Sequence, residues 1–214
     1  MTKLSVLAAA RNLAAILIFC LAGSISAQNV VRYDAVPGGG KVKIEGTSSI
    51  HDWTEEGRII KGSMELDAAF DTDLKTLTKT PKVEVSIPVR QLKNPEVKPS
   101  MDRNMYEHLK YTNYPAITYR LLELTAKANE SASAASRFEA KGELSVAGVT
   151  RTNTMPITME RVDKDKIKVT GATSLKMTDF GIKPPALTVL GIGIKTGDDV
   201  KLTFEWTAAK AEGK

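Results

Sequence analysis

Strict alternation of apolar and polar residues is the dominant pattern of the chain after residue 40. In the run from Phe138 to Val146, for example, apolar residues alternate with Glu139, Lys141 and Glu143. Successive side chains of a strand point to opposite faces, so each run predicts a strand with one buried and one solvated face. The alternating runs cover residues 41–45, 82–89, 138–146, 154–160, 166–170 and 201–207.

A further strand begins at Ile117 and Tyr119, where the phase is disturbed by Leu121, Leu122 and Leu124. An extra residue in one strand of a pair produces such a change of phase, so we predict a β-bulge there.

Turn signals separate the runs. Pro37 to Gly40 stands before the run at residue 41, Ala147-Gly148 lies between two runs long enough to form a hairpin, and Gly197 to Asp199 precedes the last run. Eight or more strands at this spacing, with little helix, predict an all-β antiparallel sandwich or barrel.

One segment, from Arg90 to Tyr114, lacks the alternation. Ser100 is a suitable N-cap, and Met101, Met105 and Leu109 recur every four residues, which places them on one face of a short helix. A short helix inserted between barrel strands lies across an open end or fills the interior, and the sequence leaves both arrangements open.

The first 27 residues have the order of a secretory signal peptide. Lys3 and Arg11 precede an apolar run from Leu13 to Ala22, and small residues follow up to Ala27. A run this short does not span a bilayer, which needs about 20 apolar residues. We therefore expect cleavage near Ala27, a mature domain over residues 28–214, and a periplasmic or secreted location, with an uncleaved anchor as the alternative.

Composition narrows the functional classes. Removing residues 1–27 takes away two positive charges and no acids, so the formal net charge falls from +5 to +3. Lys and Arg are interspersed with acids, which argues against nucleic-acid binding because phosphate affinity requires clustered cations. The mild basicity is compatible with transient contact with an anionic membrane surface. The sequence is also compatible with a homodimer.

Cysteine is absent after Cys20. A mature domain without cysteine has no disulfide, no thiol nucleophile and no cysteine-ligated metal. It must be held together by an ordinary core, and 187 residues are enough to bury one.

No constellation of residues indicates catalysis, a metal or a cofactor. His51-Asp52 and Glu107-His108 are sequence neighbours without the spacing of metal ligands, and no nucleophile elbow, phosphate loop or metalloprotease motif is present. We therefore expect structural or hydrogen-bonding roles for His51 and His108, with a metal-binding or acid–base role as the alternative.

The methionines and one uncharged stretch are more informative about function than the histidines. Six methionines follow the signal segment, and flexible thioethers suit either an irregular core or a surface that accepts flexible ligands. The stretch from Pro184 to Ile194 contains five large aliphatic residues and no charge. It fits either an edge strand packed on the core or an apolar lip at a barrel opening.

Four stretches together resemble the YceI-like family of polyisoprenoid-binding periplasmic proteins. Each is weakly specific, but their order and spacing from about residue 40 to the C-terminus are those of the family. The stretches are Thr47 to Thr54 followed by Gly62, Met101 to Lys110 followed by Tyr114 to Ile117, Gly142 to Arg151, and Leu175 to Pro184.

The resemblance implies a lipocalin-like barrel of about eight strands, with a short helical insert and an interior that holds an isoprenoid or similar lipid without enzymatic chemistry. Arg103 and His108 are the candidates for contact with a lipid head group, although they match no recognisable head-group site. Trp53, Phe180 and Leu187 are expected near an opening. The expected lining of the interior is Ile44, Val85, Ile87, Met101, Met105, Leu109, Phe138, Leu144, Met155, Ile157 and Met177.

Two alternatives to a lipid carrier remain at this point. One is an interaction or stress-response module whose barrel is filled by its own side chains, and the other is an enzyme acting on an apolar substrate with His51 or His108 as base. The carrier hypothesis requires a long, continuous apolar cavity, whereas a packed interior would favour the interaction module.

Overall fold

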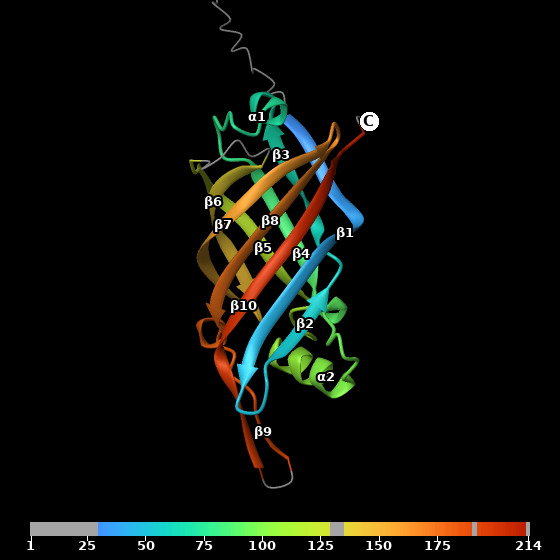
Figure 1. The fold of residues 1–214 in the computed structure, drawn as a ribbon, viewed down its shortest axis with the longest axis vertical. Helices are drawn as coiled ribbons and strands as arrows, with labels where there is room; N and C mark the ends of the chain where they lie inside the picture. Colours follow the sequence, from blue (N-terminus) through green and yellow to red (C-terminus); the bar gives the residue numbers. More distant parts are fainter. Residues whose placement is uncertain (1–29, 129–134, 190–191, 213–214) are drawn as a thin grey trace, which may run out of the picture.

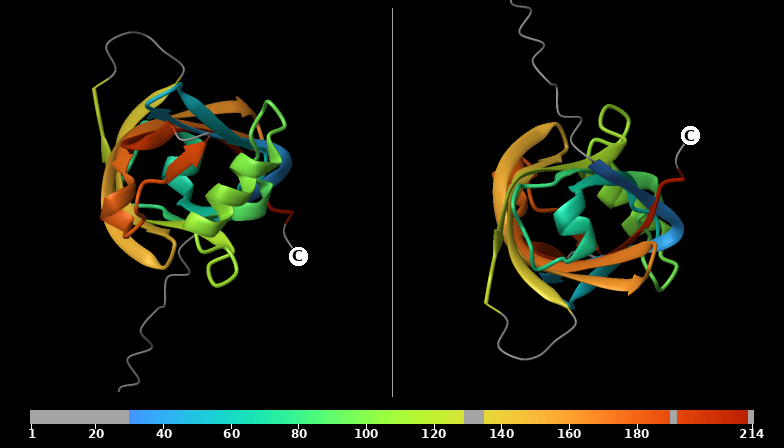
Figure 2. Two further views of the ribbon diagram at one scale, coloured as in Figure 1. Left: turned by 90° about the horizontal axis from the view of Figure 1, so that it is seen from below. Right: turned by 90° about the horizontal axis from the view of Figure 1, so that it is seen from above.

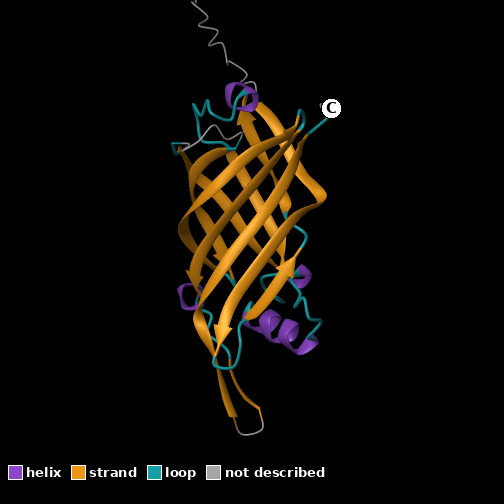
Figure 3. Cartoon of the chain, viewed as in Figure 1, coloured by secondary structure: helices purple, strands orange, loops and turns teal. Residues whose placement is uncertain are grey.

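The structure is a computed structural model that describes residues 30–128, 135–189 and 192–212. The signal segment expected over residues 1–27 therefore lies outside the described residues. Ten strands, two α-helices and two 3₁₀ turns follow one another along the described chain (Figures 1 and 3). In order, they are β1 (Val30–Ser48), β2 (Trp53–Gly57), β3 (Lys61–Asp67), α1 (Ala68–Thr72), β4 (Lys82–Pro88), η1 (Val89–Gln91), α2 (Pro99–His108), β5 (Ala116–Ala126), β6 (Ser136–Val146), β7 (Val149–Asp163), β8 (Lys166–Lys176), η2 (Met177–Phe180), β9 (Ala186–Val189) and β10 (Ile192–Lys210).

Eight antiparallel strands close into a barrel, as expected. The strands β1, β3, β4, β5, β6, β7, β8 and β10 are hydrogen-bonded in this order, and pairing of β10 with β1 closes the ring. β2 pairs with the second half of β1 and continues the line of β3. β9 pairs only with the start of β10 and forms a hairpin that projects beyond the barrel (Figure 1).

Two of the expected turns are instead irregularities within long strands. Pro37 to Gly40 lies inside β1, where the register with β10 shifts between Ala35 and Gly40. Gly197 to Asp199 lies inside β10. Both segments break the alternation of side chains as a turn does, but the backbone continues in the same direction because each is a bulge that bends a barrel strand.

Other local predictions are confirmed. Ala147 and Gly148, both with positive φ, form the two-residue turn between β6 and β7. The register of β5 with β6 shifts between Leu121 and Glu123, at the predicted bulge. α2 is the predicted helix, but it begins at Pro99 with Lys98 as N-cap, not at Ser100, because proline is already set for the first helical position.

One end of the barrel is closed by α1, whose short helix lies across the opening (Figure 2, right). Phe70 of α1 is fully buried and packs edge-on against Phe138 of β6, with ring centroids 5.7 Å apart. We call this the closed end. The opposite end carries α2, η2 and the loop between β1 and β2, and we call it the α2 end (Figure 2, left).

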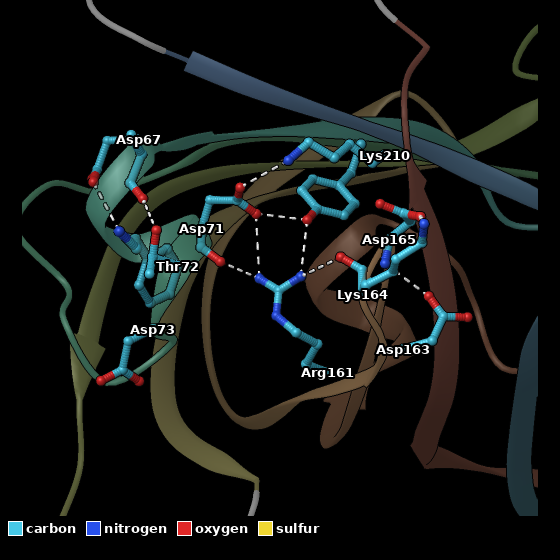
Figure 4. A network of polar contacts seen from close by, with 12 residues as sticks. Asp67, Asp71, Thr72, Asp73, Arg161, Asp163, Lys164, Asp165 and Lys210 are labelled. Carbon is cyan, nitrogen blue, oxygen red and sulfur yellow. Dashed lines mark hydrogen bonds and ion pairs between the residues drawn. The ribbon is translucent and has the colours of Figure 1, made fainter.

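A polar network fixes α1 to three strands at the closed end (Figure 4). The Tyr33 hydroxyl donates to Asp71 Oδ1 at 2.6 Å, and Lys210 Nζ lies 3.2 Å from Asp71 Oδ2. Arg161 donates to Tyr33, to Asp71 Oδ1 and to the Asp71 backbone carbonyl. One carboxylate therefore joins α1 to β1, β7 and β10.

Burial acts to raise the pKa of Asp71, but the hydrogen bonds from Tyr33, Lys210 and Arg161 outweigh it and hold that pKa below its ordinary value. A carboxyl group with a lowered pKa stabilises the fold above its unfolded-state pKa, and this contribution is lost as the pH falls through the lowered value.

No helix in the described part of the chain is long and apolar enough to cross a bilayer.

Asp71→Ala should lower the free energy of unfolding by about 2 kcal/mol at neutral pH, because it leaves Arg161 and Tyr33 without their shared acceptor. Urea unfolding measures the change. The matched control is Asp199→Ala, which removes an exposed carboxylate paired with Lys176 and should cost less than about 1 kcal/mol. Equal effects of the two substitutions would contradict the role assigned to the network.

Candidate functional site

The alternation of each strand directs one set of side chains into the barrel, and these side chains do not fill it. A cavity of about 370 Å³ runs through the interior. Its wall is almost entirely aliphatic, aromatic and thioether, and it draws on residues from every strand of the closed ring. Ligand cavities in proteins commonly have volumes of 300–1,000 Å³ and such apolar walls.

The cavity is elongated along the barrel. Within the barrel its lining on β10 extends from Val200 to Trp206, which corresponds to about 20 Å of strand at about 3.3 Å per residue. Barrel strands are tilted by about 40°, so this stretch covers roughly 15 Å along the axis, and Thr196 and Ile194 continue the wall into the β9–β10 hairpin. Leu66 and Met159 line the cavity near the closed end, whereas the exposed Ile50 and His51 line it at the α2 end.

Glycines on the inner wall keep this space open. A Cβ atom at Gly142 would lie 2.3 Å from the Tyr119 ring, one at Gly171 would lie 2.7 Å from the Phe204 ring, and one at Gly46 would lie 2.2 Å from the Trp53 ring. Each aromatic ring therefore lies against the bare backbone of a glycine. Large rings that rest on the wall in this way leave the axis of the barrel free.

α2 covers part of the α2 end and presents its apolar face to the cavity. Met101, Met105 and Leu109 all line the cavity, at the four-residue spacing seen in the sequence. Of the two arrangements left open for the helix, the structure shows the one across an end of the barrel.

α2 is held by contacts with η1 and with the segment that follows it. Lys93 Nζ lies 3.2 Å from Asp102 Oδ2, and the Asn94 backbone N–H donates to Asp102 Oδ1 at 2.8 Å. Tyr106 donates to the Leu92 carbonyl at 2.8 Å, and the Arg90 guanidinium stacks over the Tyr106 ring. These bonds fix the helix that borders the opening.

The structure brings together most of the residues predicted to line the interior. The predicted residues found on the cavity wall are Ile44, Trp53, Val85, Ile87, Met101, Met105, Leu109, Leu144, Met155, Ile157, Met177 and Phe180, together with the head-group candidate His108. Their contact with a lipid remains a prediction.

Three predicted site residues stand apart. Phe138 points inward, but it packs on Phe70 at the closed end and is not part of the cavity wall, because α1 occupies the space it faces. Arg103 is exposed on α2 and is not among the lining residues, since the helix turns that face to solvent. The side chain of Leu187, on β9, lies outside the described part of the structure.

Three polar side chains on the cavity wall were not predicted. Glu55 Oε2, Tyr119 Oη and Trp206 Nε1 are buried and have no hydrogen-bond partner within the described residues. Trp53, Glu55 and Gly57 occupy the inward positions of β2. The alternation of side chains along β2 could have identified Glu55 as an inward residue. Because Glu56 is also an acid, the sequence alone does not show which of the two points into the barrel.

Glu55 is the most unusual of these groups because it is an acid that is only 2% exposed. Burial, and secondly the Asp102 carboxylate, raise the pKa of Glu55 to about 7, against the opposing effect of the Lys93 ammonium. Burial also raises the pKa of Tyr119 to about 12. Below about pH 7, the Glu55 carboxyl group and the Tyr119 phenol are therefore mainly protonated and act as hydrogen-bond donors on the wall.

The two histidines lie on the cavity wall at the α2 end without the partners of a catalytic base. His51 Nδ1 lies 2.7 Å from the Asp52 backbone carbonyl, and His108 Nδ1 lies 2.8 Å from the Asn104 backbone carbonyl. Within the described chain, no carboxylate hydrogen-bonds either ring, and no group of three or more His, Cys, Asp or Glu side chains is placed to hold a metal.

Comparison with a protein-family model and with solved structures agrees with the barrel described above. A family model described as the YceI-like domain matches residues 34–208. A search of curated proteins finds no match.

Several solved structures share the fold. BcnA of Burkholderia cenocepacia superposes with a TM-score of 0.63 at 14% identity, covering 82% of this chain and 100% of that one. A polyisoprenoid-binding domain from Saccharophagus degradans gives 0.60 at 12% identity, with 84% and 98% covered. The Campylobacter jejuni YceI protein gives 0.54 at 16% identity, with 74% and 85% covered. At these identities the likeness establishes the architecture alone.

Glu55→Gln should remove a pH-dependent penalty on stability. A carboxyl group with a raised pKa favours the folded state at low pH, and this contribution is lost as the pH rises through about 7. The variant should therefore gain about 2 kcal/mol relative to the unsubstituted protein between about pH 5 and about pH 8. Urea unfolding at the two pH values checks this, and a difference that does not vary with pH would contradict it.

Proposed function

Because the chain belongs to the YceI-like domain family, we propose that it binds a long apolar lipid of the polyisoprenoid type inside its barrel and carries it without chemical change. The observation that carries the proposal is the long apolar cavity, lined by all strands of the ring and reaching the surface at the α2 end. The fold likeness to a solved polyisoprenoid-binding domain adds support.

The energetics favour a long ligand. Burying one CH₂ group is worth about 0.8 kcal/mol, whereas association costs roughly 4–15 kcal/mol before any net affinity appears. A chain of about five carbons would barely offset this cost. A longer chain that follows the apolar wall of the preformed cavity would bury enough CH₂ groups to exceed it.

The two alternatives receive less support. A barrel filled by its own side chains has no place for the cavity observed among the described residues. For an enzyme using His51 or His108 as base, the backbone carbonyl at each Nδ1 would leave Nε2 as the acceptor, but within the described residues no hydroxyl or carboxylate hydrogen-bonds either ring.

Export and membrane contact are parts of the same proposal. Export to the periplasm rests on the sequence of residues 1–27. At the α2 end, Ile50 lines the cavity and is 57% exposed, and Val97, which shortly precedes α2, is 81% exposed. Transient contact of this end with a membrane would let a lipid pass into the cavity with little exposure to water.

Protein purified from its host cells should carry a bound lipid, which native mass spectrometry detects as an added mass. The proposal would be contradicted by apoprotein that also fails to take up added prenyl lipids.

Ala140→Phe should abolish or strongly reduce lipid uptake. Ala140 is 2% exposed and lies on the cavity wall, so the added ring would occupy the space of the ligand. The matched control is Lys141→Phe, which places the same ring on the outer face of β6 and should bind lipid normally. Thermal melts establish that both variants fold, and native mass spectrometry measures the bound fraction. Equal uptake by the two variants would contradict binding inside the barrel.

A further inference from the structure

Glu55 is a buried carboxyl group on the wall of an otherwise apolar cavity, and its Oε2 atom has no partner among the described residues. A buried polar atom without a hydrogen bond is costly, and native structures rarely keep one without a reason. The residue sits on β2, opposite Ile44 of β1, where an aliphatic side chain would continue the wall. Its position therefore indicates contact with something that enters the cavity.

The surroundings of Glu55 determine which chemistry it offers. The charged groups that act on it are Asp102 of α2 and Lys93, and these two form an ion pair of 3.2 Å with each other. Asn104, His51 and His108 also line the cavity at the α2 end. Burial, with Asp102 as the second cause, raises the pKa of Glu55 to about 7, so the carboxyl group is protonated below that pH and donates its O–H.

The other two unpartnered atoms have the same polarity. Trp206 Nε1 is a donor only, and the Tyr119 phenol keeps its proton because burial raises its pKa to about 12. All three orphaned groups on the wall thus offer hydrogens, and none of them is a cation. Lys176 also lines the cavity, but its ammonium group pairs with Asp199 at 3.0 Å.

We propose, as an extension of the proposed lipid-binding function, that Glu55 selects lipids with an uncharged acceptor oxygen, such as a ketone, ester or amide carbonyl, and disfavours anionic lipids in the cavity. The protonated carboxyl group donates to the acceptor oxygen while the hydrocarbon part of the lipid fills the apolar space. A phosphate or carboxylate brought to the same position meets a group that becomes an anion itself when it loses its proton.

The test compares three probes on protein expressed from the full-length chain and then delipidated. Squalene has no polar atom, geranylgeranylacetone adds a ketone to a prenyl chain, and geranylgeranyl diphosphate carries an anion. The quantity measured is the ratio of ketone affinity to squalene affinity in each variant. Because ratios are compared between variants, the unequal lengths of the probes cancel.

Glu55→Leu and Glu55→Met should lower this ratio about tenfold, since they remove the donor. Glu55→Gln keeps an N–H donor and should retain the ratio. In the unsubstituted protein the ratio should fall as the pH rises through about 7, and in Glu55→Gln it should stay constant. Glu56→Gln, on the outer face of the same strand, is the matched control and should behave like the unsubstituted protein.

An unchanged ratio in both apolar variants would overturn the role of Glu55, because it would mean that water satisfies Oε2 with or without a lipid. Tighter binding of the diphosphate than of the ketone to the unsubstituted protein would also overturn it. In either case squalene binding still supports the carrier function. Failure of the unsubstituted protein to bind any of the three probes would instead remove the proposed function and, with it, this extension.

Discussion

The pairing of β1 with β10 is the interaction on which the remainder of the structure depends. It brings together two segments from opposite ends of the domain, with Val42 opposite Phe204 and Ile44 opposite Leu202. Closure leaves the ring without a free edge, and it fixes which face of every strand points inward. A slip of one residue would turn the apolar face of a strand to solvent and its charged face into the barrel.

An eight-stranded ring encloses a space that side chains can just fill or that can hold one small ligand, so the choice of inward residues decides between these outcomes. Here glycines at 46, 142 and 171 let aromatic rings lie against the backbone of the wall. The space that those rings would have occupied near the axis remains open. The cavity therefore depends on the glycines of the wall as much as on its apolar side chains.

The two ends of the barrel differ in the forces that hold them. At the closed end, charged hydrogen bonds around Asp71 and the contact of Phe70 with Phe138 hold α1 across the opening. At the α2 end, polar bonds hold the outer side of α2 while thioethers face the cavity. A ligand therefore has a route through one end only of the described structure. Glu55 lies in this apolar wall at a cost to stability, and this cost is the observation from which its proposed role is argued.

The family resemblance favoured a barrel over a sandwich. The sequence pattern by itself determined the antiparallel strands, the hairpin at Ala147-Gly148, the helix with Met101 and Met105, and most of the aliphatic lining. These features depend on periodicity and turn chemistry, which are local properties of the chain. The tertiary structure alone decided that Pro37 to Gly40 bends a strand without ending it, that Phe138 belongs to the closed end, and that Arg103 faces solvent. It also decided that Glu55, and not the neighbouring Glu56, enters the cavity. Each of these depends on which distant segment lies opposite, and in a closed ring that is fixed only when the last strand meets the first.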